Sequence, residues 1–216
     1  MDNGSTLAFT IAGCFLGYVL KVAINWLKID NYSIKKNNYF LEFICGALSL
    51  WSYLNIPLYE AFIFSLIASI LVAIGIVDFY TMQIPLLFIL FGILFAIAGL
   101  LIGLMSWIAV LWGIFIGAVM PTMIMGVTWI ITKRQGMGYG DIQLGIVLGA
   151  WLGPMRMALT LFGAALISLL TWIYISLRKG FDRDRALPFA PFLAASAIGI
   201  YIGSVYYPSF FHLIIK

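Results

Sequence analysis

Long apolar runs, separated by short polar stretches, make up most of the chain. A membrane-spanning helix needs about 20 mostly apolar residues. By this criterion we expect helices at residues 5–27, 39–55, 58–77, 85–104, 107–132, 155–177 and 187–207. The pattern predicts an all-α polytopic membrane protein, folded as one integral-membrane domain over residues 1–216.

One further apolar piece, residues 142–153, is too short to cross a membrane. At about 1.5 Å per residue it rises only about 18 Å, whereas the hydrocarbon core is about 30 Å thick. The pair Gly153-Pro154 then breaks the helix before the next run. We therefore expect a short helix, a turn and a full span in this region, which brings the total to about eight helical segments.

The basic residues predict how these segments cross the membrane. Cytoplasmic loops are enriched in Lys and Arg. With the N-terminus outside, the cytoplasmic loops would carry Lys28, Lys35, Lys36, Lys133, Arg134, Arg178, Lys179, Arg183 and Arg185. The outside would carry only Arg156 and Lys216. A single crossing over residues 142–177 would instead put the cluster at 178–185 outside, so we expect an N-out/C-out topology with eight segments.

Composition supports a membrane protein and argues against several other classes. The chain is 64% hydrophobic and 9% charged, with a mean hydropathy of +1.10, whereas soluble domains average about 25% charged residues. The net charge of +4 comes from residues that flank apolar runs, so we expect a lipid bilayer and no nucleic acid as partner. The opening "MDNGST" lacks a basic stretch, and we expect the first span to be retained.

Cysteine and histidine usage points away from a metal site. Cys14 and Cys45 both lie within apolar segments, which argues against a disulfide framework or a zinc knuckle. The one histidine, His212, lies in the C-terminal tail. We therefore expect no metal, and no serine or cysteine nucleophile with a histidine base.

Three acidic residues, Glu42, Asp78 and Asp141, lie near the predicted cytoplasmic boundary. An ionisable group at membrane depth is costly and is a functional hypothesis by default. The simpler interpretations are that Asp141 caps a helix and that Asp78 is a polar residue at a span end. Against them, the topology brings both aspartates to one face. In addition, glycines that allow a close backbone approach precede Asp141, at positions 136, 138 and 140.

Two carboxylates at one site can perform aspartic-protease chemistry, with one as base toward water and the other as proton donor. Other glycines indicate close helix contacts rather than chemistry. Their spacing selects Gly92, Gly99, Gly103, Gly113 and Gly117.

Four stretches together carry a family resemblance. The stretch "GMGYGDIQLGIVLGAWLGP" (136–154) closely resembles the GxGD signature of bacterial type IV prepilin peptidases. The stretch "VDFYTMQIP" (77–85) is similar to the motif of that family's first aspartate. "LPFAPFLA" (187–194) resembles the segment near its last span, and "YFLEFICGAL" (39–48) resembles the segment with its glutamate. The four occur in the family's order over nearly the whole chain.

The resemblance implies a multi-pass aspartic endopeptidase of the bacterial cytoplasmic (inner) membrane. Such enzymes remove the basic leader from type IV prepilins or pseudopilins after a glycine, at the cytoplasmic face, and need no cofactor for proteolysis. Asp78 and Asp141 correspond to the catalytic pair. The resemblance also suggests residues that bind substrate or shape the site: Glu42, Pro85, Gly138, Gly140, Pro188 and Pro191.

Departures from the family pattern concern mainly a second activity. Many members carry a cytoplasmic zinc domain with two CxxC pairs, but here the loop is only "KIDNYSIKKNN". Lys21 stands where the family has asparagine. We therefore expect proteolysis and leave open whether S-adenosylmethionine-dependent methylation of the new N-terminus is retained.

Two alternatives remain at this point. A proton-coupled small membrane transporter could use the same aspartates as relay groups. A presenilin-type protease also uses GxGD, but it has a tyrosine before the first aspartate, where this chain has Val77.

Overall fold

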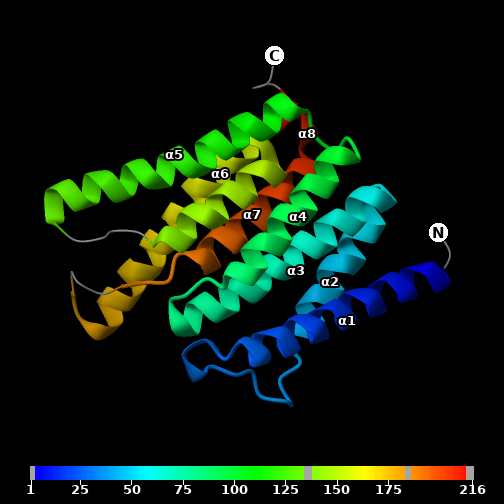
Figure 1. The fold of residues 1–216 in the computed structure, drawn as a ribbon, viewed down its shortest axis with the longest axis horizontal. Helices are drawn as coiled ribbons and strands as arrows, with labels where there is room; N and C mark the ends of the chain where they lie inside the picture. The colour runs from blue at the N-terminus through cyan, green and yellow to red at the C-terminus, as the bar shows by residue number, and fades with distance from the viewer. Residues whose placement is uncertain (1–2, 134–137, 183–185, 213–216) are drawn as a thin grey trace.

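The computed structural model describes residues 3–133, 138–182 and 186–212, and all regular structure in these ranges is helical (Figure 1). This confirms the all-α prediction. The helices are α1 (Asn3–Leu27), a 3-10 helix η1 (Ile29–Asn31), α2 (Phe40–Asn55), α3 (Leu58–Thr81), α4 (Leu86–Leu101), α5 (Trp107–Thr132), α6 (Tyr139–Lys179), α7 (Ala190–Tyr206) and α8 (Pro208–His212). Arg134, Gly136, Arg183, Arg185 and Lys216, named above, lie outside the described residues.

Helix length and composition support a polytopic membrane protein. Among the described residues, α1, α3, α5 and α6 contain stretches long and apolar enough to cross a membrane. The helices α4 and α7 are apolar but shorter, with 16 and 17 residues. The orientation of the bundle relative to the membrane remains a prediction.

Helix α6 is interrupted at Gly153, whose φ of 73° and ψ of 179° are not helical. The two halves run in opposite directions, so that α6 folds back as a hairpin (Figure 1). Contacts agree: a Cβ on Gly117 of α5 would overlap the carbonyl oxygen of Gly145 and lie 3.3 Å from Met157 Cε. A straight helix would hold residues 145 and 157 about 18 Å apart. The predicted short helix and the break after it are therefore confirmed.

Because α6 folds back, the helical segments alternate in direction along the chain (Figure 1). The ends of α1, α3, α5 and α6 and the starts of α2, α4, α6 and α7 gather at one end of the bundle. We call this end, which holds residues 28–39, 82–85 and 138–141, the basic end. The described basic residues found there are Lys28, Lys35, Lys36, Lys133, Arg178 and Lys179. Arg156 follows the hairpin turn at the opposite end.

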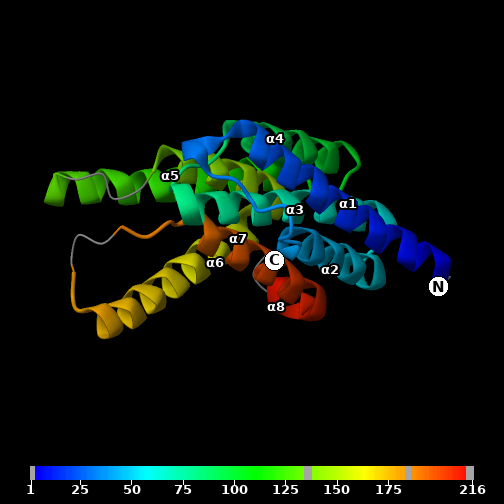
Figure 2. The ribbon, with the colours of Figure 1, turned by 90° about the horizontal axis from the view of Figure 1, so that it is seen from below.

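The second half of α6 diverges from α5 toward its C-terminus, and both helices project beyond the rest of the bundle (Figure 2). Its side chains there are largely exposed, and Leu177 is 82% exposed. In a bilayer, such apolar side chains contact lipid.

Helix α3 extends beyond the predicted end at residue 77, so that Asp78 lies in its last turn rather than after it. The Thr81 hydroxyl donates to the Val77 carbonyl oxygen at 2.8 Å. Met82, in the left-handed conformation with φ 52°, then ends the helix, and its N–H donates to the Asp78 carbonyl oxygen. Apolar patterning alone does not detect this cap.

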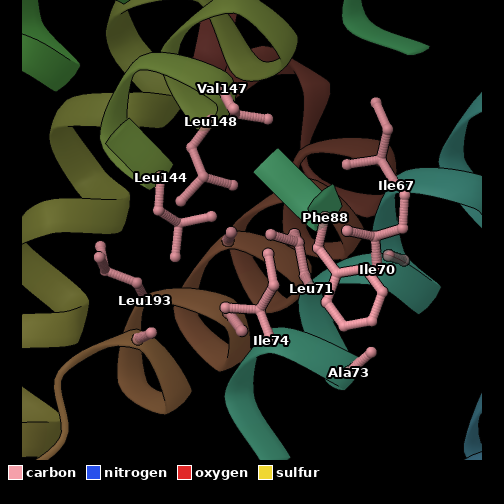
Figure 3. Packing of buried hydrophobic residues seen from close by; sticks show 14 of the residues in the cluster. Ile67, Ile70, Leu71, Ala73, Ile74, Phe88, Leu144, Val147, Leu148 and Leu193 are labelled. Atoms are coloured by element: carbon pink, nitrogen blue, oxygen red, sulfur yellow. The ribbon is translucent and has the colours of Figure 1, made fainter. Parts of the chain in front are cut away.

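The part of the buried core shown in Figure 3 lies between α3, α4, the first half of α6 and α7. Ile74 of α3 lies four residues before Asp78, Leu144 of α6 lies three residues after Asp141, and both are buried. The other large buried side chains drawn in Figure 3 include Ile67, Leu71, Phe88, Leu148 and Leu193. This core fixes the starts and ends of the helices that carry the candidate site.

Glycines allow α5 and the first half of α6 to touch backbone to backbone. A Cβ on Gly113 would overlap the carbonyl oxygen of Gly149, and one on Gly145 would overlap that of Gly117. Small residues at such positions permit close approach of membrane helices. Gly103, also predicted for a helix contact, instead lies in the turn after α4 with φ 85° and open space around it, so that prediction is wrong.

We predict that Gly117→Val lowers the free energy of unfolding by about 1–3 kcal/mol, the usual cost of overpacking. Gly126→Val is the matched control, since a Cβ on Gly126, also in α5, meets nothing within 4 Å. Denaturant unfolding of the detergent-purified proteins measures the difference. Equal unfolding midpoints for the two variants would contradict the close contact between α5 and α6.

Candidate active site

Asp78 is held by the start of α7. Its carboxylate Oδ2 accepts a hydrogen bond of 3.1 Å from the backbone N–H of Ala190, the first residue of that helix. The first N–H groups of a helix have no partner within the helix and favour an anion. One turn earlier on α3, a Cβ on Gly75 would lie 3.3 Å from Pro191 Cα. Close packing of α7 on α3 therefore positions this donor.

Asp141 is held by its own helix. It is the third residue of α6, and its Oδ2 accepts a hydrogen bond of 3.1 Å from the N–H of Gly138, which precedes the helix. This is the half of a capping box in which an acidic side chain reaches back to the helix start. The N-cap itself is Gly138, so Asp141 contributes to capping from the third position of the helix and does not occupy the cap position.

The turn between α3 and α4 lies against the start of α6. A Cβ on Gly140 would lie 3.1 Å from Ile84 Cβ, so a larger residue there would require Ile84 to shift. Ile84 belongs to the turn that follows Asp78, and Gly140 precedes Asp141. The contact therefore brings the chain beside one aspartate against the chain beside the other.

The two aspartates form a buried pair at the basic end. Asp78 is 5% exposed and Asp141 is 8% exposed, and the contact of Ile84 with Gly140 brings the segments beside them together. Each uses Oδ2 on a backbone N–H. Within the part of the chain that the structure describes, no hydrogen bond to either Oδ1 is found. Such a pair can share one proton and bind a water molecule between its Oδ1 atoms.

The three predicted prolines lie in the segments around the pair. Pro85 is buried and precedes the first residue of α4, Pro188 is half-buried just before α7, and Pro191 packs against Gly75 as described. They fix the entry of α4 and α7 into the bundle.

Glu42 is placed differently from the other predicted site residues. Its Oε1 forms an ion pair of 2.9 Å with Lys21 Nζ, and both side chains are buried. Among the described residues it forms no hydrogen bond with either aspartate. Sequence reasoning noted Lys21 only as a departure from a family pattern and did not predict this pair. The pair could have been predicted because Lys21 and Glu42 carry opposite charges and each lies inside an apolar run.

Within the described ranges, no cluster of three or more His, Cys, Asp or Glu side chains could hold a metal ion. Cys14 and Cys45 are free thiols.

A known protein family matches the part of the chain that contains this pair of aspartates. A model of the type IV leader peptidase family matches residues 65–173, half of the 216-residue chain. The chain belongs to this family. The matched region contains both aspartates, Pro85, Gly138 and Gly140, whereas Glu42, Pro188 and Pro191 lie outside it.

Similar proteins carry one name, prepilin leader peptidase/N-methyltransferase. The relative from Aeromonas hydrophila is 29% identical over 143 residues, 60% of this chain and 45% of the relative. That from Dichelobacter nodosus is 36% identical over 113 residues, 52% of this chain and 36% of the relative. That from Bacillus subtilis (strain 168) is 32% identical over 150 residues, 69% of this chain and 57% of the relative. The chain thus spans about half the length of these curated relatives. No solved structure matches it.

We predict that Lys21→Met lowers the free energy of unfolding by about 3–5 kcal/mol, because it leaves the Glu42 carboxylate buried without its partner. Lys35→Met is the control, since Lys35 is exposed. The double variant Lys21→Met/Glu42→Leu removes both charges and is expected to regain most of the loss. Denaturant unfolding in detergent checks all three proteins, and a Lys21→Met midpoint equal to that of Lys35→Met would contradict the buried pair.

Proposed function

We propose that this protein is a membrane aspartic endopeptidase that removes the leader from type IV prepilins or pseudopilins. The observation that supports it most is the buried pair of carboxylates, Asp78 and Asp141, inside the region matched by the type IV leader peptidase family. The proposed reaction is hydrolysis of one peptide bond, at the cytoplasmic face of a bacterial inner membrane.

In this mechanism a water molecule lies between the two Oδ1 atoms, with one aspartate ionised and the other protonated. The ionised carboxylate takes a proton from water while the water oxygen bonds to the scissile carbonyl carbon, and the protonated aspartate gives its proton to the carbonyl oxygen. The resulting tetrahedral diol collapses. The C–N bond breaks, the leaving nitrogen takes a proton from the first aspartate, and the diol returns a proton to the second.

The backbone contacts suit this chemistry because they fix each carboxylate without occupying its second oxygen. Ala190 N–H and Gly138 N–H each donate to one Oδ2. Both carboxylates are therefore already held in position before substrate binds. Preorganised groups of this kind avoid reorganisation during the reaction.

The position of the pair also suits a substrate with a polar leader joined to an apolar helix. The aspartates lie at the basic end, at the level where several apolar helices start or end. A substrate helix in the bilayer would present its junction with the leader at this level. The proposal covers proteolysis alone and does not extend the relatives' N-methyltransferase name to this chain.

We predict that Asp78→Asn and Asp141→Asn each slow leader removal by roughly 10²–10⁴-fold, the usual contribution of a general acid or base. The assay incubates purified protein in detergent with a prepilin and follows leader removal by mass spectrometry. Asp182→Asn is the matched control, because Asp182 is an exposed aspartate after α6. Its cleavage rate is expected to equal that of the wild type.

The same assay separates the alternatives. Wild-type cleavage rates in either Asp78→Asn or Asp141→Asn would overturn the catalytic pair. Absence of cleavage by the wild type, together with aspartate-dependent proton flux in liposomes, would favour the transporter instead.

A further inference from the structure

The loop between α1 and α2, residues 28–39, contacts the segment that follows Asp78. Gln83 Nε2 donates a hydrogen bond of 2.9 Å to Asp30 Oδ2. The rings of Tyr32 and Tyr80 stack with centroids 4.9 Å apart and planes 17° apart. Two separate side-chain contacts thus join this loop to residues two and five positions beyond Asp78.

Lys21, a buried side chain of α1, holds the far part of this loop. Its Nζ donates to the carbonyl oxygens of Lys36 and Asn38, at 3.1 and 2.6 Å, as well as to Glu42. All three donors of the ammonium group are therefore used. The last residues of the loop cannot move from α1 without leaving a buried charge partly unpaired.

Asn25, one turn further along α1, holds the middle of the loop. Its side-chain amide donates to the Ile34 carbonyl oxygen at 3.2 Å and accepts from the Ile34 N–H at 2.7 Å. Ile34 itself is buried in the hydrophobic core. The residues of the loop that follow Tyr32 are therefore held against α1.

The first part of the loop adopts a conformation that few residues favour. Lys28, Asp30 and Asn31 have φ values of 46°, 46° and 58°. Left-handed conformations are uncommon outside glycine and persist where the surroundings determine them. In this conformation the Asp30 side chain reaches Gln83.

The segment after Asp78 is held from its other side as well. Ile84 lies against Gly140, next to Asp141, as described above. The last residues of α3 and the turn at 82–85 therefore contact both the α1–α2 loop and the start of α6. A shift of the loop would move this turn, and with it the relation between the two aspartates.

We infer that the α1–α2 loop is a positioning element for the aspartate pair, with Tyr32 and Asp30 as positioning residues that act through Tyr80 and Gln83. This inference rests on the proposed function. On this inference the short loop does more than connect α1 and α2, because it holds the segment after Asp78 in the position that the reaction requires.

The experiment compares Tyr32→Ala and Asp30→Ala with the conservative variants Tyr32→Phe and Asp30→Asn. Phenylalanine keeps the ring that stacks on Tyr80, and asparagine keeps an oxygen that can accept from Gln83. We expect each alanine variant to lower kcat for prepilin cleavage roughly tenfold with KM unchanged, within the roughly 10²-fold that a 1 Å misplacement can cost. The conservative variants Tyr32→Phe and Asp30→Asn are expected to have the kcat of the wild type.

A second measurement does not depend on activity. Hydrogen exchange of the backbone amides in residues 79–84 is expected to speed up in both alanine variants, with exchange in the core of α3 unchanged. Unchanged exchange at 79–84 in both variants would overturn the inference, whatever the activity.

The outcomes separate the two proposals. If the wild type cleaves prepilin and the alanine variants have its kcat, the positioning role fails while the proposed function stands. If the wild type does not cleave, the proposed function fails, and the positioning role in the reaction fails with it. The exchange data then report only on whether the loop holds the turn.

Discussion

The break at Gly153 is the constraint on which the position of the candidate site depends. A continuous helix over residues 139–179 would carry its start and its end to opposite ends of the bundle. Because the chain reverses at this residue, α6 starts and ends at the basic end. Helix α7 therefore also starts at the basic end, where its Ala190 N–H reaches Asp78 near the end of α3. The glycine contacts with α5 hold the short half in place, so the reversal is part of the packed bundle.

Burial of two carboxylates at one end of the bundle needs compensation, and the structure supplies it from helix starts. The N–H groups of Ala190 and Gly138 belong to the starts of α7 and α6, where backbone donors are free in any helix. Neither contact adds a cationic side chain, which would hold both aspartates ionised. The buried Lys21–Glu42 pair shows the other solution, with a full opposite charge, at a place where no shared proton is needed.

Much of this arrangement could be predicted from the chain. The apolar runs predict the helices, and the pair Gly153-Pro154 predicts the break in α6. The positions of the basic residues predict a topology in which Asp78 and Asp141 lie at one end of the bundle. These features depend on residues close together in sequence, or on rules for whole segments. The resemblance to a peptidase family added roles for the two aspartates, which remain a proposal.

Other features could not be predicted, because they depend on which faces of the helices meet. Helices in a membrane are apolar all round, so periodicity does not say that α7 lies on α3 or that Ala190 reaches Asp78. The pairing of Lys21 with Glu42 required knowing that α1 and α2 cross at Gly17, where a Cβ would lie 2.7 Å from Glu42 Cα. The contacts of Tyr32 and Asp30 depend on a loop conformation with left-handed residues, which no composition rule predicts.

The reversal at Gly153 also constrains how the protein enters the membrane during synthesis. Residues 139–152 rise about 21 Å, which is less than the roughly 30 Å of the hydrocarbon core. They cannot be inserted as an independent span, and their glycine face has no partner until α5 is in place. We therefore expect this segment to enter the bilayer together with residues 154–179, as a hairpin against an already inserted α5. Assembly of the aspartate pair would then be a late event, completed only after most of the chain has left the ribosome.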